Sequence, residues 1–207
     1  MILLIAILLG SLAGLIRAWV RYETIKVLPL RAIWLVFAAY LPQYLCTSLP
    51  YTRELISPTW VPFILLGSQT LLLAFVWLNR KFAGIWAMAS GLFSNFLVML
   101  LNHGFMPLTP ENAQKLIAPG VQVSLQIGER IEFGKDILLP KANTKLWVLS
   151  DIFLTPPWMN SRAAFSIGDI FISVGAFLFL WSLGDSQKYQ SMEVKNTEEI
   201  NSKIIRT

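Results

Sequence analysis

The chain has 207 residues, of which 55% are hydrophobic and only 14% are charged, with a formal net charge of +5. Soluble domains are nearer one quarter charged, so this composition indicates an integral membrane protein and argues against a soluble domain. The length allows one domain, and the single cysteine, Cys46, excludes an internal disulfide. The positive charge does not indicate nucleic-acid binding, because the basic residues flank apolar stretches, where they set membrane orientation.

Five apolar stretches have about the length of membrane-spanning helices, since a bilayer core about 30 Å thick takes roughly 20 residues in a helix. They cover residues 1–16, 32–49, 60–78, 82–101 and 166–183. Pro42 lies inside the second stretch and is expected to kink it. The first stretch has no preceding cation and is followed by Arg17 and Arg21, which favours a retained helix over a cleaved signal peptide. We therefore predict an all-α membrane protein with a five-helix transmembrane bundle in residues 1–183.

The positions of the cations predict the orientation of this bundle. Two short connections, after the first span and between the third and fourth, carry most of the basic residues near the spans: Arg17, Arg21, Lys26, Arg31, Arg80 and Lys81. Positively charged short loops stay in the cytoplasm. The N-terminus is therefore predicted outside, and the polar tail 184–207 is predicted to be cytoplasmic and disordered or weakly helical.

The connection between the fourth and fifth spans, residues 102–165, forms a predicted outer loop that is too long to be structureless. Thr109-Pro110-Glu111 has the pattern of a helix start, so a short helix is expected through about Ile117. Apolar and polar residues alternate from Val121 and a turn follows at Gly128, which predicts a small β-hairpin over Val121–Phe133. Three aromatic residues are expected to anchor the loop at the membrane interface: Trp147, Phe153 and Trp158.

Small residues recur at helical spacing in two of the spans. Gly10 and Gly14 form a GxxxG pattern, which lets a second helix approach closely, although tolerated membrane glycines would look the same. In the fourth span, small residues form a seam beside Asn95: Gly84, Ala87, Gly91 and Ser94. Asn95 either orients a functional carboxylate or bonds to a neighbouring helix.

Two acids at the predicted outer face are the main functional candidates, since ionisable groups near membrane depth are costly to keep. Asp169 begins the last span, and Asp151 lies where the loop returns to the membrane. The chain between them contains the Pro156-Pro157 turn and can fold back to bring the carboxylates together. Two close carboxylates share a proton and can activate water as base and acid. The alternatives are a first-turn acid that complements the helix dipole, for Asp169, and an interfacial cap, for Asp151.

Four further polar residues complete the candidate site. Asn95 and Ser166 are expected to line the same pocket as the acids, and Asn102 and His103 stand at the mouth of the fourth span. His103 is the only histidine and has no cysteine or acid near it in sequence, so a helix-end or loop hydrogen bond is expected. No metal and no cofactor are predicted. The assigned roles are catalytic for Asp151 and Asp169, and substrate-binding or orienting for the other four.

Three segments resemble motifs of the lipoprotein signal peptidases, which are membrane aspartic peptidases. Phe165–Asp169 resembles their F-N-x-A-D motif, Val148–Asp151 resembles the segment with the second catalytic aspartate, and Ser90–Asn95 resembles a G-N motif. The resemblance implies a catalytic pair and a lipid-modified or membrane-embedded peptide substrate. The chain departs from that family at Ser166, which replaces an asparagine, and in its loop, which comes between spans four and five.

Over its whole length the chain resembles small five-helix bacterial membrane proteins of unknown function. The shared features are an N-x-G-x-M-P element, here Asn102–Pro107, and an S-I-G-D motif, here Ser166–Asp169. This resemblance implies the bacterial inner membrane and gives no activity.

Two functions stay open at this point. One is a membrane aspartic peptidase or related hydrolase acting near the outer leaflet. The other is a non-catalytic small subunit or assembly factor of a larger membrane complex. A transporter is disfavoured, because the sequence has no midplane charges and no repeated halves. The expected partners are membrane lipid and other membrane protein subunits, with no nucleic acid.

Overall fold

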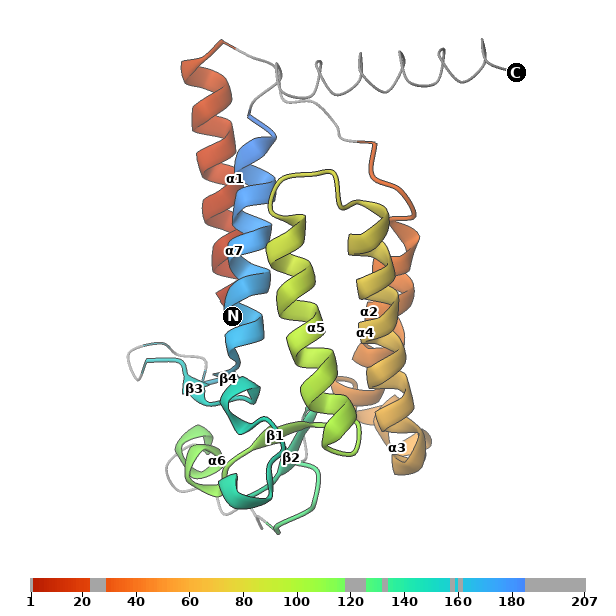
Figure 1. The fold of residues 1–207 in the computed structure, drawn as a ribbon. Coiled ribbons are helices and arrows are strands. Elements are labelled where there is room, and N and C mark those ends of the chain that lie inside the picture. The colour runs from red at the N-terminus through yellow and green to blue at the C-terminus, as the bar shows by residue number, and fades with distance from the viewer. Residues whose placement is uncertain are drawn as a thin grey trace, which may run out of the picture.

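The computed structural model describes residues 2–22, 29–117, 126–131, 134–156, 159 and 162–184. The chain is mostly helical, with a few short strands. The long helices stand side by side, and most of the short elements gather at one end of them (Figure 1). The long helices are α1 (Ile2–Val20), α2 (Trp34–Thr47), α4 (Val61–Leu78), α5 (Ile85–Leu101) and α7 (Ile167–Ser182).

Two helical segments are long and apolar enough to cross a membrane, namely Ile2–Val20 and Pro58–Leu78, while α5 and α7 are shorter apolar helices. This supports association with a membrane, and the five-span bundle stays a prediction. The helices also present large apolar side chains outward, a surface that water would not stabilise. Examples are Leu8, Trp19, Phe37, Phe63, Trp77 and Phe93.

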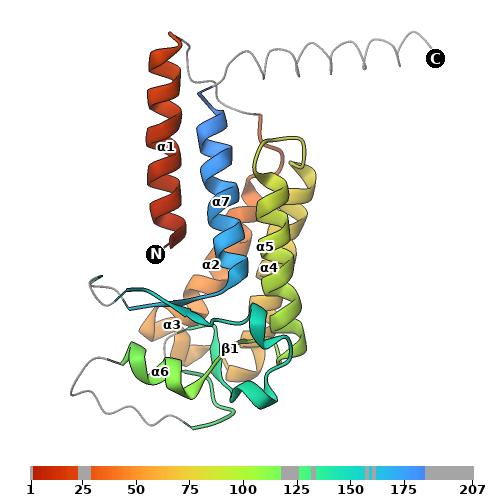
Figure 2. The same cartoon turned by 60° about the vertical axis from the view of Figure 1, so that its left-hand side comes forward.

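The described part of residues 102–165 forms a unit at the end where α1 and α7 begin, and we call it the cap (Figure 2). In the cap, β1 (Met106–Leu108) pairs in parallel with β2 (Asp136–Leu138), and β3 (Phe153–Leu154) pairs antiparallel with β4 (Ala164–Phe165). The remaining cap elements are helix α6 (Pro110–Leu116) and the 3-10 turns η2 (Lys141–Asn143) and η3 (Trp147–Leu149). Before α4 lie α3 (Pro50–Leu55) and the 3-10 turn η1 (Pro58–Trp60).

The predicted short helix of the loop is present as α6. The Thr109 hydroxyl accepts a hydrogen bond from the backbone N–H of Asn112 at 3.3 Å, as an N-cap does. The predicted hairpin over Val121–Phe133 lies largely outside the described residues, and so does Trp158. Within the described part, Gly128 turns the chain with φ +87° and Arg130 bridges to Ile137.

Glycines let α7 approach two neighbouring helices. On α1, a Cβ at Gly10 would lie 2.9 Å from the Cα of Phe177, and one at Gly14 would lie 2.6 Å from the carbonyl oxygen of Leu180. On α5, a Cβ at Gly91 would lie 2.9 Å from the backbone nitrogen of Ile172. Both small-residue patterns therefore mark close helix packing against α7, as GxxxG-type contacts do.

Candidate functional site

The first turn of α7 is built by a local sequence pattern. Ser166 is the N-cap, and its hydroxyl accepts from the backbone N–H of Asp169 at 3.1 Å. In return, the Asp169 carboxylate accepts from the backbone N–H of Ser166 at 3.0 Å. This reciprocal arrangement is a capping box, and it fixes the Asp169 side chain at the cap end of the helix.

Asn95 on α5 joins this turn through its side-chain amide. Its Nδ2 donates to Oδ1 of Asp169 at 2.9 Å, and its Oδ1 accepts from the Ser166 hydroxyl at 2.8 Å. Gly168 makes room for the amide, because a Cβ there would lie only 2.8 Å from the Asn95 side-chain carbon Cγ. Asn95 is 3% exposed, so these bonds form away from solvent.

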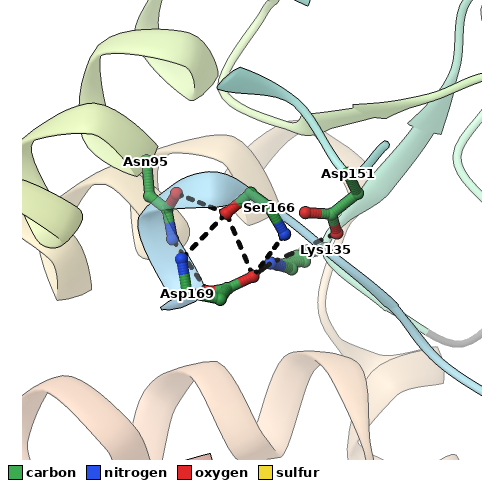
Figure 3. Close-up of polar contacts among 5 residues, drawn as sticks. All are labelled: Asn95, Lys135, Asp151, Ser166 and Asp169. Atoms are coloured by element: carbon green, nitrogen blue, oxygen red, sulfur yellow. Dashed lines mark hydrogen bonds and ion pairs between the residues drawn. The ribbon is translucent and has the colours of Figure 1, made fainter. Parts of the chain in front are cut away.

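Lys135 of the cap connects the two predicted acids. Its Nζ lies 3.4 Å from Oδ2 of Asp151 and 3.9 Å from Oδ2 of Asp169 (Figure 3). The Asp151 side chain is 1% exposed, whereas those of Lys135 and Asp169 are 27% and 24% exposed. We call Asn95, Lys135, Asp136, Asp151, Ser166 and Asp169 the Lys135 cluster.

Strand β1 brings the cap residues of the cluster to α7. The N–H of Met106 donates to the carbonyl of Lys135 at 2.9 Å, and the N–H of Asp151 donates to the carbonyl of Pro107 at 3.3 Å. The chain reaches β1 through a sharp turn after α5, in which His103 and Gly104 have φ values of +60° and +83°. Positive φ favours glycine, which accounts for Gly104 in the N-x-G-x-M-P element.

Asp136 adds a third acid beside Asp151. Burial and the charge of Asp151 raise the pKa of Asp136 to about 7. Burial also raises the pKa of Asp151, against the lowering effect of Lys135. Oδ1 of Asp136 and Oδ1 of Asp151 are buried without a hydrogen-bond donor, whereas Oδ2 of Asp151 has the ammonium of Lys135 at 3.4 Å. Neighbouring carboxylates resist carrying two negative charges, so this setting favours a proton on one of the two acids.

The ammonium of Lys135 stays charged in this setting. Burial by itself lowers its pKa, but the carboxylates of Asp151 and Asp169 outweigh burial and raise the pKa above its ordinary value. Lys135 is therefore a fixed cation at neutral pH and cannot act as a base.

The raised pKa of Asp136 predicts that stability falls as pH rises from about 4 to about 7. In the unfolded chain this acid loses its proton at its ordinary value of 3.8, whereas the folded protein keeps it to about 7. The folded state binds more protons in that window, so raising the pH destabilises it. Thermal unfolding at pH 5 and pH 8 should show a lower midpoint at pH 8 in the wild type. Asp136→Asn should reduce the difference, and the control Glu129→Gln should keep it; equal slopes in all three proteins would contradict this assignment.

A cavity of about 240 Å³ lies beside the cluster, where α1, β4 and α7 begin. Lys135 and Asp169 reach it among mostly apolar walls that include Leu3, Phe165 and Ile172. Asp151 does not line it, so the two predicted catalytic acids do not face the same space.

The structure thus brings together four of the six predicted site residues: Asn95, Asp151, Ser166 and Asp169. Asn102 is buried elsewhere, where it donates to the carbonyls of Val98 and Lys145 and joins the end of α5 to the cap. His103 is exposed. Among the described residues, no group of three metal-ligating side chains is present.

Sequence reasoning missed Lys135 and Asp136. They stand next to each other before the apolar run Ile137–Leu139, which is a signal for a strand edge. Adjacent opposite charges in a loop are common at solvated surfaces, so nothing in the sequence linked these two residues to Asp151 and Asp169.

Comparison with known proteins places the chain in a family. One family model matches residues 27–181, from before α2 to near the end of α7. The chain belongs to DUF5317, a family of unknown function. The DUF5317 match begins after α1 and includes every residue of the Lys135 cluster. Comparisons with curated proteins and with solved structures gave no match. The expected uncharacterised family is confirmed, while the bacterial source and the likeness to signal peptidases stay predictions.

Proposed function

We propose that this DUF5317 chain is a non-catalytic membrane module, a small subunit or assembly factor of a larger membrane complex. In this proposal the Lys135 cluster is a clasp that holds the cap on α5 and α7. The observation that carries it is the ammonium of Lys135, which lies within 3.9 Å of both carboxylates. An aspartic peptidase needs its two carboxylates to share a proton, and here a cation joins them instead.

The hydrogen bonds of Asp169 also favour a clasp. Besides Lys135, its carboxylate accepts from the Asn95 amide and the Ser166 backbone N–H. All of these donors belong to the chain itself and stabilise the ionised form. Such a carboxylate is held as the partner of Lys135 and links three elements: the cap, α5 and α7.

A membrane hydrolase is the second candidate, because the cavity of about 240 Å³ reaches Lys135 and Asp169. In that reading Asp169 would take a proton from water and Lys135 would stabilise the developing oxyanion. The substrate would be a lipid-modified or membrane-embedded peptide, cleaved near the outer leaflet.

The proposal includes five spans in the bacterial inner membrane, with the N-terminus and the cap outside and the C-terminus in the cytoplasm. Its support is the outward apolar surface of the helices and the cations Arg17, Arg80 and Lys81. Arg17 lies in the last turn of α1, and Arg80 and Lys81 lie in the link between α4 and α5. The end of α1 and this link are at the end of the bundle opposite the cap (Figure 1). Labelling of cysteines introduced at Lys141 or Lys81 in intact cells tests this orientation. Only the cysteine at Lys141 should react with a reagent added from outside.

A double-mutant cycle between Lys135 and Asp169 tests the clasp. We expect Lys135→Met and Asp169→Asn each to lower the free energy of unfolding in detergent, with a coupling energy of about 1–3 kcal/mol between them. Residues kept for catalysis commonly cost stability, so a hydrolase site predicts variants as stable as the wild type or more stable. The exposed Lys145 gives the control pair, since Lys145→Met with Asp169→Asn should be additive. Absence of coupling between Lys135 and Asp169 would overturn the clasp.

A further inference from the structure

Two cavities meet at the end of the bundle opposite the cap, where α4 passes into α5. The larger, of about 430 Å³, runs between these helices and is lined mostly by apolar and aromatic side chains, among them Leu73, Trp77, Trp86 and Phe93. The smaller, of about 210 Å³, is lined by three cations, Arg31, Arg80 and Lys81. Arg80 lines both, so the apolar groove and the basic pocket lie on either side of one shared side chain.

The basic pocket is organised by a buried asparagine. Asn79 is 1% exposed, and its side chain accepts from the backbone N–H of Arg31 and donates to the carbonyl of Arg31, both at 2.9 Å. These two bonds hold the segment before α2 against the link between α4 and α5. The cation of Arg31 is thereby kept beside those of Arg80 and Lys81, although it lies far from them in the sequence.

Arg80 is held at the junction of the two cavities. Its guanidinium carbon lies 4.8 Å from the centre of the Trp77 ring, and its Nη1 donates to the Trp77 carbonyl at 3.1 Å. Trp77 in turn meets Trp86 edge to face, with ring centres 6.4 Å apart. Tryptophan and arginine are typical of the level at which acyl chains meet headgroups.

The basic pocket has the side chains that an anion binds. Among the described residues, no acidic side chain lines either cavity. An apolar groove beside a basic pocket fits a molecule with an acyl chain and a phosphate, and basic pockets between membrane helices bind anionic headgroups.

We propose that this groove and the basic pocket bind one anionic phospholipid, with the phosphate at Arg31, Arg80 and Lys81 and an acyl chain between α4 and α5. The inference rests on the membrane arrangement of the proposed function and is independent of the clasp. It assigns this end of the bundle to lipid binding and leaves the cap end to the Lys135 cluster.

Native mass spectrometry of the full chain tests the inference, with phosphatidylglycerol, phosphatidylcholine and glycerol 3-phosphate as probes. The wild type should retain phosphatidylglycerol in preference to phosphatidylcholine. Arg80→Gln should weaken phosphatidylglycerol binding at least about five-fold, since each cation near a lipid surface contributes about 1 kcal/mol. Lys81→Gln, at an exposed residue, should weaken it in the same direction.

Arg17 provides the matched control. Its guanidinium also lies 4.8 Å from a tryptophan ring, that of Trp181, but it lines neither cavity, so Arg17→Gln should bind as the wild type does. Equal retention of the two lipids, or unchanged binding by both Arg80→Gln and Lys81→Gln, would overturn the inference. Displacement of the lipid by glycerol 3-phosphate would reduce the site to a small-anion site. Failure to retain any lipid would count against the membrane arrangement itself.

Discussion

Asn95→Leu is expected to lower the free energy of unfolding by about 3 kcal/mol, since hydrogen bonds to a charged group contribute roughly 1.5–3 kcal/mol each. The asparagine donates to Asp169 and accepts from Ser166 in a site where it is 3% exposed. Leucine has a similar size but offers neither bond. Oδ1 of Asp169 would lose the amide donor and the Ser166 hydroxyl would lose its acceptor on Asn95, so α7 would lose this polar link to α5.

Urea unfolding of the protein in detergent micelles measures this loss. Ser94, the preceding residue of α5, provides the control, because its hydroxyl donates only to the carbonyl of Ser90 within the same helix, at 2.9 Å. Ser94→Ala should change the free energy of unfolding by less than about 0.5 kcal/mol. If Asn95→Leu were as stable as Ser94→Ala, the amide would have no part in joining α5 to α7.

Gly91→Ala is expected to cost about 1–3 kcal/mol, the range for overpacking a well-packed contact. The added Cβ would lie 2.8 Å from Cγ1 of Ile172 and 2.9 Å from its backbone nitrogen, and it would also meet the carbonyl of Gly168. Backbone atoms cannot rotate away as a side chain can, so α7 itself would have to move. That movement would carry Asp169 away from Asn95.

Gly67 on α4 gives the matched comparison, because a Cβ there would meet no atom within 4 Å. Gly67→Ala should be neutral or slightly stabilising, since alanine favours a helix over glycine by up to about 1 kcal/mol. Thermal unfolding of both variants separates close packing from the general effect of removing a glycine. Equal midpoints for the two variants would mean that α5 and α7 do not pack through Gly91 in solution.

The two predictions bear on the same question as the clasp. Asn95 and Gly91 set the distance between α5 and α7, and Lys135 joins that pair to the cap. If the cluster is a structural device, losses at all three positions should appear as losses of stability. If Asp169 is instead kept for chemistry, the changes at Asn95 and Gly91 should lower stability, whereas a change at Lys135 should not.

The sequence by itself determined the features that depend on near neighbours in the chain. The length of the apolar stretches predicted the long helices, and the pattern Thr109-Pro110-Glu111 predicted α6 with its Thr109 cap. S-I-G-D gave the start of α7, because a capping box links residues only three positions apart. The small-residue spacing at Gly10, Gly14 and Gly91 marked the faces that pack against α7, since helical geometry alone puts such residues on one side.

Only the tertiary structure decided which charges meet. Lys135 and Asp151 reach Asp169 because both are hydrogen-bonded to the short strand β1, through Met106 and Pro107. A three-residue parallel pairing between segments so far apart leaves no periodic pattern in the sequence. The same holds for the raised pKa values of Asp136 and Asp151, which require burial that the chain acquires only after the cap has folded. Whether two acids form a catalytic pair or are bridged by a lysine is therefore set by loop closure, since a local sequence pattern specifies neither the partner of a charge nor its burial.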